Sequence, residues 1–319
     1  MKFIDIPQPR TLDQYNSAID EMTDRIRNHQ GVVSIYQIGS VSNPGLSDID
    51  MLVVFEDDAN VQVDPVRDFP SDTYLFTHQI YGVPKQHWNE LRSLTFFHNY
   101  RFIEGEELPE IKPDLDDNEI QSLKRQIALE FLVKMYIVLS VQLRYDIVKL
   151  RSFLLEGKAL VYDLEFLGID QGEMHDLVQK VIKIRADWWN NKPSDTELKT
   201  LITDLYESLT QLLNEQLDEA PLYLPSEEPF SISRNVHVSN GALEVRSSGL
   251  VIPNLGLFAE RKHFNLLNRF NRFQIRFPYR LPKDNSVIQR RFELLSKLRN
   301  HNTKQLPGFL IPASSLRVI

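Results

Sequence analysis

The sequence contains no cysteine among its 319 residues. This absence excludes a disulfide framework, a zinc site with cysteine ligands and a cysteine nucleophile, and it fits a reducing compartment. The first ten residues, MKFIDIPQPR, lack the apolar stretch that a secretory signal needs. The most apolar stretch, residues 127–155, is interrupted by charged side chains. We therefore expect a cytoplasmic protein with no transmembrane helix.

Repeats and low-complexity segments are also lacking, and the chain is longer than one compact core usually holds, so we expect two or three domains. Charge is spread unevenly between them. Residues 221–319 contain 15 Lys and Arg against 6 Asp and Glu, a net charge of +9, whereas residues 1–220 carry −17. This basic third either binds a polyanion or packs on the acidic remainder.

Two short apolar strands surround a polar loop at residues 32–55. The first strand, residues 32–38, is rich in β-branched residues, and the second is predicted from Asp48 to Phe55. Asp48 and Asp50 are two residues apart, so on a strand they point to the same face, roughly 6.5–7 Å apart. Carboxylates this close repel each other, and a divalent cation removes the conflict. The alternative is an ordinary hairpin with two surface aspartates.

The sequences IGS at 38–40 and DIDM at 48–51 resemble the active-site signature of the DNA polymerase beta-like nucleotidyltransferase superfamily. The resemblance covers roughly the first 110 residues. It implies that Asp48 and Asp50 bind catalytic Mg²⁺. Seven residues separate Ser40 from Asp48, a few fewer than is usual in the superfamily, so this loop must be tight. The resemblance also implies nucleotide contacts from the loop residues Gly39, Ser40 and Ser47.

The superfamily usually supplies a third carboxylate from the next strand, which we predict at Thr73–Val83. That stretch contains no acid. His78, expected at mid-strand, is the candidate base, so the predicted catalytic set is Asp48, Asp50 and His78. A strand histidine is alternatively a hydrogen-bonded structural residue. Asp72 and Glu104 are the remaining candidates for the missing acid.

Periodicity divides the rest of the chain into a helical region and a region of short strands. The fold we predict is an α/β mixed-sheet nucleotidyltransferase core (residues 1–115), an α-helical bundle (116–220) and a smaller C-terminal domain with β-strands (221–319). Capping boxes at Thr11 and Ser194 predict helix starts. Further helices are expected at 85–92, 119–143, 146–167 (bent near Gly157), 173–190 and 285–299. Further strands are expected at 95–103, 231–238, 242–245, 249–252 and 273–280.

These observations predict an enzyme that transfers a nucleoside monophosphate from an NTP to an acceptor hydroxyl or phosphate, releasing pyrophosphate. The expected acceptor is small and anionic, drawn in by Arg272, Arg276 and Arg280. A nucleic acid is not favoured as the acceptor because of the net charge of −8, and no membrane partner is expected. The competing hypothesis is a catalytically inactive nucleotidyltransferase-like binding module.

Overall fold

The computed structural model describes residues 1–67, 74–95, 99–110, 114–254, 256–312 and 316. It is a mixed α/β structure, as predicted, and its internal contacts divide the chain into two compact units. The core unit consists mainly of residues 8–123 and 286–313, and the helical unit mainly of residues 1–7 and 124–285.

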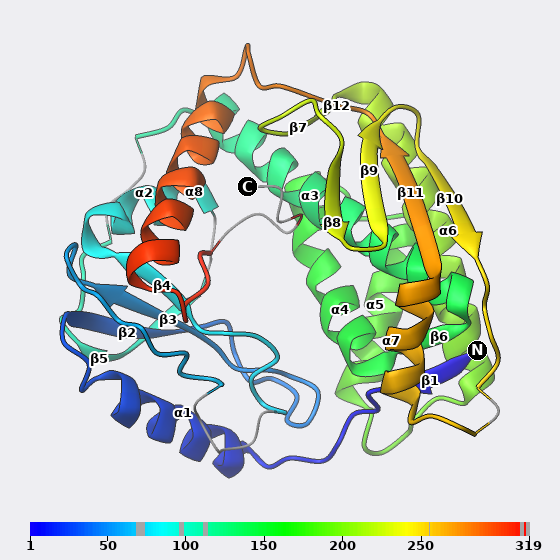
Figure 1. Cartoon of the computed structure of the whole chain (residues 1–319), viewed down its shortest axis with the longest axis horizontal. Coiled ribbons are helices and arrows are strands. Elements are labelled where there is room, and N and C mark those ends of the chain that lie inside the picture. Colours follow the sequence, from blue (N-terminus) through cyan, green and yellow to red (C-terminus); the bar gives the residue numbers. More distant parts are fainter. Residues whose placement is uncertain (68–73, 96–98, 111–113, 255, 313–315, 317–319) are drawn as a thin grey trace. The chain divides into compact units, whose positions relative to one another are not determined.

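A mixed sheet in the order β4-β3-β2-β5 forms the centre of the core unit, with β3 and β4 parallel and the other pairs antiparallel (Figure 1). The strands are β2 (Val32–Ile38), β3 (Asp50–Phe55), β4 (Tyr81–Pro84) and β5 (Tyr100–Gly105). The helices are α1 (Leu12–Ile26), the 3₁₀ turn η1 (Lys85–His87), α2 (Trp88–Thr95) and α8 (Ser286–Gln305).

Helix α1 covers one face of this sheet. Its start is a capping box, in which the Thr11 hydroxyl accepts a hydrogen bond from the Gln14 N–H and the Gln14 side chain accepts one from the Thr11 N–H. The apolar side of α1 packs on Ile35, Met51 and Val53, which alternate with residues of the opposite sheet face. The helix start predicted at Thr11 is therefore confirmed.

The predicted strand Thr73–Val83 is wrong over most of its length. Only Tyr81–Pro84 pairs as β4, while residues 74–80 form turns and bends, and Thr73 lies outside the described residues. Leu75, Phe76 and Ile80 are nonetheless buried in the same core as α1. Their apolar pattern reflects burial of a loop rather than strand pairing, a distinction that periodicity does not make.

Helix α8 belongs to the core unit, although it lies within the stretch predicted as the C-terminal domain. The Asn302 side-chain amide donates a hydrogen bond to the Gly82 carbonyl at 2.9 Å, and the Phe309 ring stands edge-on to Phe55 at 4.9 Å. Leu310 is hydrogen-bonded to the residues on either side of Tyr81. Its N–H donates to the Ile80 carbonyl, and its carbonyl accepts from the Gly82 N–H. Residues 302–310 thereby pack into the hydrophobic core of the core unit.

The helical unit is built around the predicted bundle. Its helices are α3 (Asp117–Tyr145), α4 (Leu150–Phe166), α5 (Glu173–Ala186) and α6 (Asp195–Glu219), and a short parallel pair joins β1 (Lys2–Ile4) to β6 (Ile147–Lys149). The Ser194 capping box is confirmed. The helix expected to be broken or bent near Gly157 is not broken there, because α4 continues through this residue. A Cβ at Gly157 would meet Val181 of α5 at 3.3 Å, so the glycine permits close helix packing.

Among the described residues, α3 is the one helix long and apolar enough to cross a membrane by length and composition. Of its most apolar window, 67% is buried inside the fold, which is typical of the core helix of a soluble protein. Its length and composition are therefore explained by its central place in the bundle.

A second mixed sheet, in the order β10-β11-β9-β8, belongs to the helical unit. Its strands are β8 (Phe230–Ser233), β9 (Val236–Asn240), β10 (Glu244–Gly249) and β11 (Asn271–Phe277), preceded by helix α7 (Glu260–Phe270), and β7 (Leu222–Tyr223) pairs with β12 (Tyr279–Arg280). The single strand predicted at 231–238 is two strands joined by a tight turn, and α7 was not predicted.

The second sheet shares a core with the bundle. The Tyr145 ring, at the end of α3, packs edge-on against Phe264 of α7 and Phe273 of β11, at 5.5 and 5.7 Å. These contacts explain why the regions predicted as a helical domain and a C-terminal domain fall into one compact unit.

Candidate metal centre

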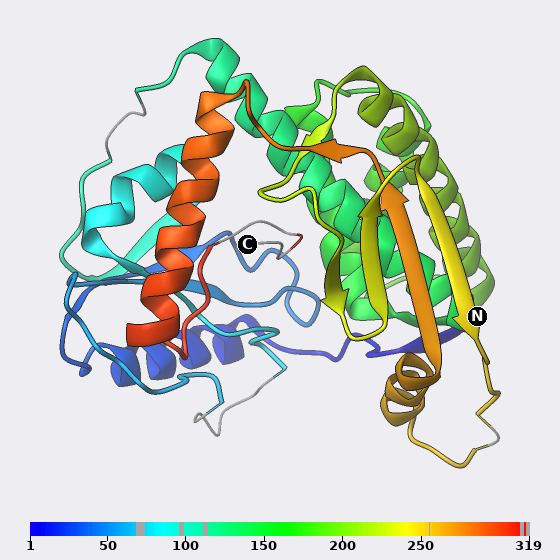
Figure 2. The ribbon, with the colours of Figure 1, turned by 45° about the horizontal axis from the view of Figure 1, so that its top comes forward.

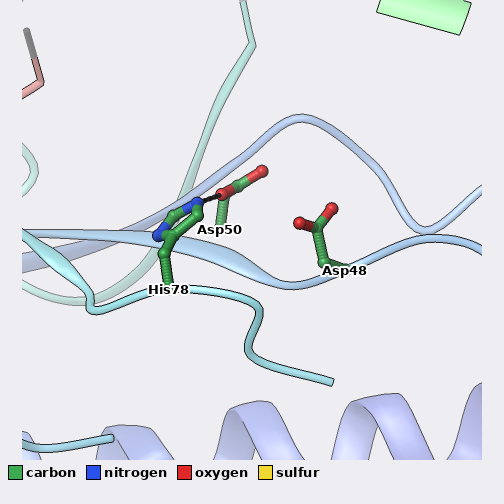
Figure 3. Close-up of side chains that lie close together, drawn as sticks. All are labelled: Asp48, Asp50 and His78. Atoms are coloured by element: carbon green, nitrogen blue, oxygen red, sulfur yellow. Dashed lines mark ion pairs between the residues drawn. The ribbon is translucent and has the colours of Figure 1, made fainter. Parts of the chain in front are cut away.

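Asp50 is the first residue of β3, so the strand predicted from Asp48 begins two residues later and Asp48 precedes it. Asp50 pairs with Ile38, the last residue of β2. Ile49 is buried in the core beneath α1, so the residues on either side of it, Asp48 and Asp50, point away from that helix. Figure 3 shows both carboxylates on one side of the chain. The sheet thereby places two acids together at the entrance of a buried strand.

His78 completes the group from the bend before β4. Its Nε2 lies 2.8 Å from Oδ1 of Asp50 (Figure 3). Ligand atoms of Asp48, Asp50 and His78 all lie within 4.8 Å of one another. The predicted catalytic set is thus brought together, although His78 stands in an irregular segment rather than in mid-strand. Its ring is further positioned by Tyr81, whose ring centroid is 5.1 Å away.

The contacts of His78 favour its charged form. Its Nδ1 lies 2.6 Å from the carbonyl oxygen of Gln79, which can only accept a hydrogen bond, so Nδ1 carries a proton. Nε2 faces a carboxylate, so the doubly protonated ring can donate to both of these acceptors. Burial lowers the pKa of His78, but the hydrogen bond and charge of Asp50 outweigh burial, with smaller help from Gln79 and Asp48, and the pKa is raised overall. The imidazolium therefore offsets part of the repulsion between the two aspartates.

Thr77 is a site residue that the sequence analysis missed. Its hydroxyl donates a hydrogen bond to Oδ2 of Asp48 at 2.5 Å. Thr77 precedes His78 directly, so the bend before β4 supplies one contact to each aspartate. Its sequence signal is only this adjacency to His78, because a threonine in an apolar stretch has many uses.

The loop from Gly39 to Ser47 is held tightly, as its short length predicted. The Tyr15 hydroxyl of α1 donates to the Ser47 carbonyl at 2.6 Å and accepts from the Gly45 N–H at 3.1 Å. Ser47 is buried, and its hydroxyl accepts a hydrogen bond from the Asn43 N–H at 3.3 Å. The contacts of Ser47 therefore serve the loop itself.

Gly39 and Ser40 form the open part of that loop. Gly39 has φ of +70°, a conformation that favours glycine, and its N–H donates to the Asn99 carbonyl at 2.9 Å. No atom beyond its chain neighbours lies within 4 Å of the place where a Cβ would stand, and Ser40 is exposed. A ligand can therefore approach the backbone closely at this point, beside Asp50.

The alternative third acids do not join the group. Glu104 lies on β5 and forms an ion pair with Arg27 at 3.2 Å, and Asp72 lies outside the described residues. Within the described part of the chain, the group that could hold a metal contains no carboxylate besides Asp48 and Asp50. The third member of the group is therefore a histidine, His78.

The donor atoms fit a divalent cation. Mg²⁺ commonly uses one or two carboxylates together with water and substrate phosphates, and two aspartates meet that need. Both Asp50 and His78 are about one-third exposed, at 32% and 28%, so the group is open to an incoming ion. A bound cation would replace the charge that the His78 imidazolium supplies, so cation binding and loss of that proton are coupled.

A hollow of about 370 Å³ lies elsewhere in the core unit, lined by Tyr36, Arg92, Tyr100, Phe102, Glu107, Leu108, Pro109 and Glu110. The hollow and the metal group lie on the same sheet. Ile38 pairs with Asp50 of the metal group on one side and with Tyr100 of the hollow on the other. Two strand spacings put Tyr100 roughly 10 Å from Asp50 on the same sheet face. A molecule held at Asp50 would have to reach across Ile38 to enter this hollow.

Comparisons with protein-family models, curated proteins and solved structures found no match to this chain.

Proposed function

We propose that the chain is a Mg²⁺-dependent nucleotidyltransferase that acts in the cytoplasm. The observation that carries the proposal is the group of Asp48, Asp50 and His78 beside the open Gly39-Ser40 turn, at one end of two neighbouring strands. This juxtaposition is what phosphoryl transfer requires, because that chemistry depends mainly on positioning and charge neutralisation. Residues 1–115 are the proposed catalytic domain, with 116–220 and 221–319 as accessory regions.

In the proposed reaction an acceptor oxygen attacks the α-phosphorus of an NTP. The bond between the α-phosphorus and the bridging oxygen to the β-phosphate breaks, pyrophosphate leaves, and the acceptor proton passes to a base. Asp48 and Asp50 would hold Mg²⁺, which supplies charge neutralisation at the phosphates. The hydrogen bond from Thr77 holds the Asp48 carboxylate in place. The open backbone at Gly39 and Ser40 would leave space for the triphosphate. His78 can take the acceptor proton only when Nε2 is neutral.

The expected acceptor is small and anionic, and the proposed attraction comes from Arg272, Arg276 and Arg280. These arginines are exposed, and each has a contact close to its own strand: Arg272 with the Arg269 carbonyl, Arg276 with Glu244 and Arg280 with Tyr223. Such contacts leave guanidinium N–H groups for an anion. The double variant Arg272→Gln/Arg276→Gln tests whether acceptor affinity depends on these arginines.

A second candidate function, an inactive nucleotide-binding module, is favoured by one observation. The third member of the group is His78 rather than a carboxylate, and its pairing with Asp50 lowers the negative charge available for metal. The two functions differ in turnover but share Mg²⁺-dependent nucleotide binding.

The experiment that tests the proposal measures pyrophosphate release with each of four NTPs, Mg²⁺ and a panel of small phosphorylated and hydroxyl acceptors. Turnover that needs Mg²⁺ and disappears in Asp50→Asn supports the enzyme. Glu56→Gln, at the exposed far end of β3, is the matched control and should keep full activity. Mg²⁺-dependent binding of a nonhydrolysable NTP without turnover supports the inactive module. Binding unchanged in Asp48→Asn/Asp50→Asn contradicts both.

A further inference from the structure

The helical unit exposes an unusual concentration of apolar side chains at one end of its sheet. Ten large hydrophobic side chains are exposed in the described part of the chain, and six of them fall within residues 250–270. These six are between 38% and 75% exposed: Leu250, Val251, Ile252, Leu257, Phe258 and Phe270. Single exposed apolar residues are ordinary, but a contiguous group marks an interaction site.

Hydrogen bonds hold the backbone of three of these residues, Leu250, Ile252 and Phe258. The loop after β10 runs back along α7, with the Leu250 carbonyl accepting from the Asn271 amide at 3.0 Å and the Ile252 carbonyl lying 2.8 Å from Nε2 of His263. Asn254 then bonds both the N–H and the carbonyl of Phe258, just before α7 begins. Figure 2 shows α7 extending beyond the start of β11. The apolar side chains therefore project from a fixed scaffold.

Cations surround these apolar side chains. Residues 249–272 contain four Lys and Arg and one acid, and the four cations are exposed: Arg261, Lys262, Arg269 and Arg272. The single acid, Glu260, is already paired with Lys2. On α7 the buried side is His263, Phe264 and Leu267, which leaves Arg261, Lys262 and Arg269 on the solvent side. The six apolar and four basic residues together are called the basic apolar surface.

We infer that the basic apolar surface docks the protein on an anionic lipid bilayer. Apolar side chains in a protruding loop can enter the boundary between headgroups and acyl chains, while neighbouring Lys and Arg side chains contact anionic headgroups. Four of the six apolar side chains of the surface are aliphatic, and aliphatic side chains cannot stack on bases as a nucleic-acid site requires. Charge complementarity therefore selects an anionic membrane surface.

This inference revises the expectation of no membrane partner. That expectation followed from the absence of a stretch apolar enough to span a bilayer. Peripheral docking needs no segment that spans the bilayer. It needs only a few inserted apolar side chains with Lys and Arg side chains around them. None of the residues of the basic apolar surface belongs to the metal centre. Arg272 is the one residue that the surface shares with the proposed attraction of the acceptor, and the variants that test the surface leave Arg272 unchanged.

The test is co-sedimentation of the full chain with vesicles of phosphatidylcholine containing about 30% phosphatidylserine, against vesicles of phosphatidylcholine alone. We expect at least about tenfold stronger binding to the anionic vesicles, weakened by raising the salt concentration. Leu257→Asp/Phe258→Asp should lose about tenfold or more in binding. The double variant Arg261→Gln/Lys262→Gln should lose about tenfold and respond less to salt.

The matched control is Leu12→Asp/Trp189→Asp, which removes one exposed leucine and one exposed aromatic residue outside the surface and should bind vesicles as the wild type does. Thermal melts confirm that each variant is folded. Equal binding to both kinds of vesicle, or none to either, overturns the inference. A dimer in sedimentation equilibrium that Leu257→Asp/Phe258→Asp dissociates, with no vesicle binding, would identify a second copy of the chain as the occupant instead.

Discussion

The two mixed sheets of this protein have the same number of strands but treat charge differently. In the core unit, β3 runs from the partly exposed Asp50 through five buried residues, so charge is confined to its first position. In the helical unit, β11 alternates buried and exposed residues along its whole length, with Arg272 and Arg276 on the open face. A charge beside a strand that is buried on both faces needs a specific reason, whereas a charge on an open face does not.

The charged side chains of the two sheets also differ in the contacts that hold them. Asp48 and Asp50 are held by hydrogen bonds from Thr77 and His78, two consecutive residues of one bend. Arg276, in contrast, lies over Gly241, where a Cβ would stand 2.3 Å from its guanidinium, and contacts Glu244 at 3.8 Å. The first arrangement fixes donor atoms at one point, and the second spreads charge over a surface.

The largest effect should come from Asp50→Asn. We expect nucleotide transfer to fall by at least about a thousandfold, equivalent to about 4 kcal/mol of transition-state stabilisation, because a metal ligand is lost. The free energy of unfolding should change by less than about 1 kcal/mol, since relief of the repulsion with Asp48 offsets loss of the His78 ion pair. Pyrophosphate release and chemical denaturation measure the two quantities. A strongly destabilised variant would show that the pair is structural.

The next effect concerns the core of the second sheet. Phe273→Ala should lower the free energy of unfolding by about 3–5 kcal/mol, because Phe273 is fully buried and packs on Tyr145. Its neighbour Gln274 points to the open face, so Gln274→Ala should stay within about 0.5 kcal/mol. Urea denaturation of both variants measures the contrast. Equal losses would mean that the outer face of the second sheet is covered.

A smaller effect is expected from His78, and it depends on pH. Because the folded-state pKa of His78 is raised above its unfolded value, its stabilisation is fully present below the unfolded pKa and disappears as pH rises through the folded pKa. His78→Gln should therefore cost on the order of 1 kcal/mol near pH 5 and much less near pH 9. Urea denaturation across this range without Mg²⁺ gives the profile. A pH-independent difference would contradict the charged pair with Asp50.

The same proton predicts how metal affinity varies with pH. Mg²⁺ binding should weaken as pH falls through the raised pKa of His78, because the cation and the imidazolium compete for Asp50. Calorimetric titration in two buffers of different ionisation enthalpy would reveal the released proton. In His78→Gln the dependence attributable to this proton should vanish.

The smallest stability effect is expected for Arg272→Gln/Arg276→Gln, within about 0.5 kcal/mol per exposed site. If these arginines attract an anionic acceptor, the variant should bind the acceptor several-fold more weakly and with a flatter salt dependence. A melt and a salt titration separate this outcome from a structural role. Loss of stability with unchanged acceptor affinity would end the functional interpretation of the second sheet.

The sequence alone determined the parts of this protein that are local. The capping boxes at Thr11 and Ser194, the two apolar strands on either side of the loop after Ile38 and the burial of one face of β11 all follow from neighbouring residues and their periodicity. The candidate pair Asp48 and Asp50 was found in the same way, because a spacing of two on a strand fixes the side to which both point.

Only the tertiary structure decided what lies beside that pair. The contact of Nε2 of His78 with Asp50 depends on residues 74–80 folding as a buried loop rather than as a strand. The place of α8 likewise depends on Asn302 and Phe309 meeting Gly82 and Phe55, far apart in the chain. Such contacts arise because a close-packed core is filled by segments that can be distant in the chain. Apolar periodicity predicts that a residue is buried, but it does not predict which residues pack against it.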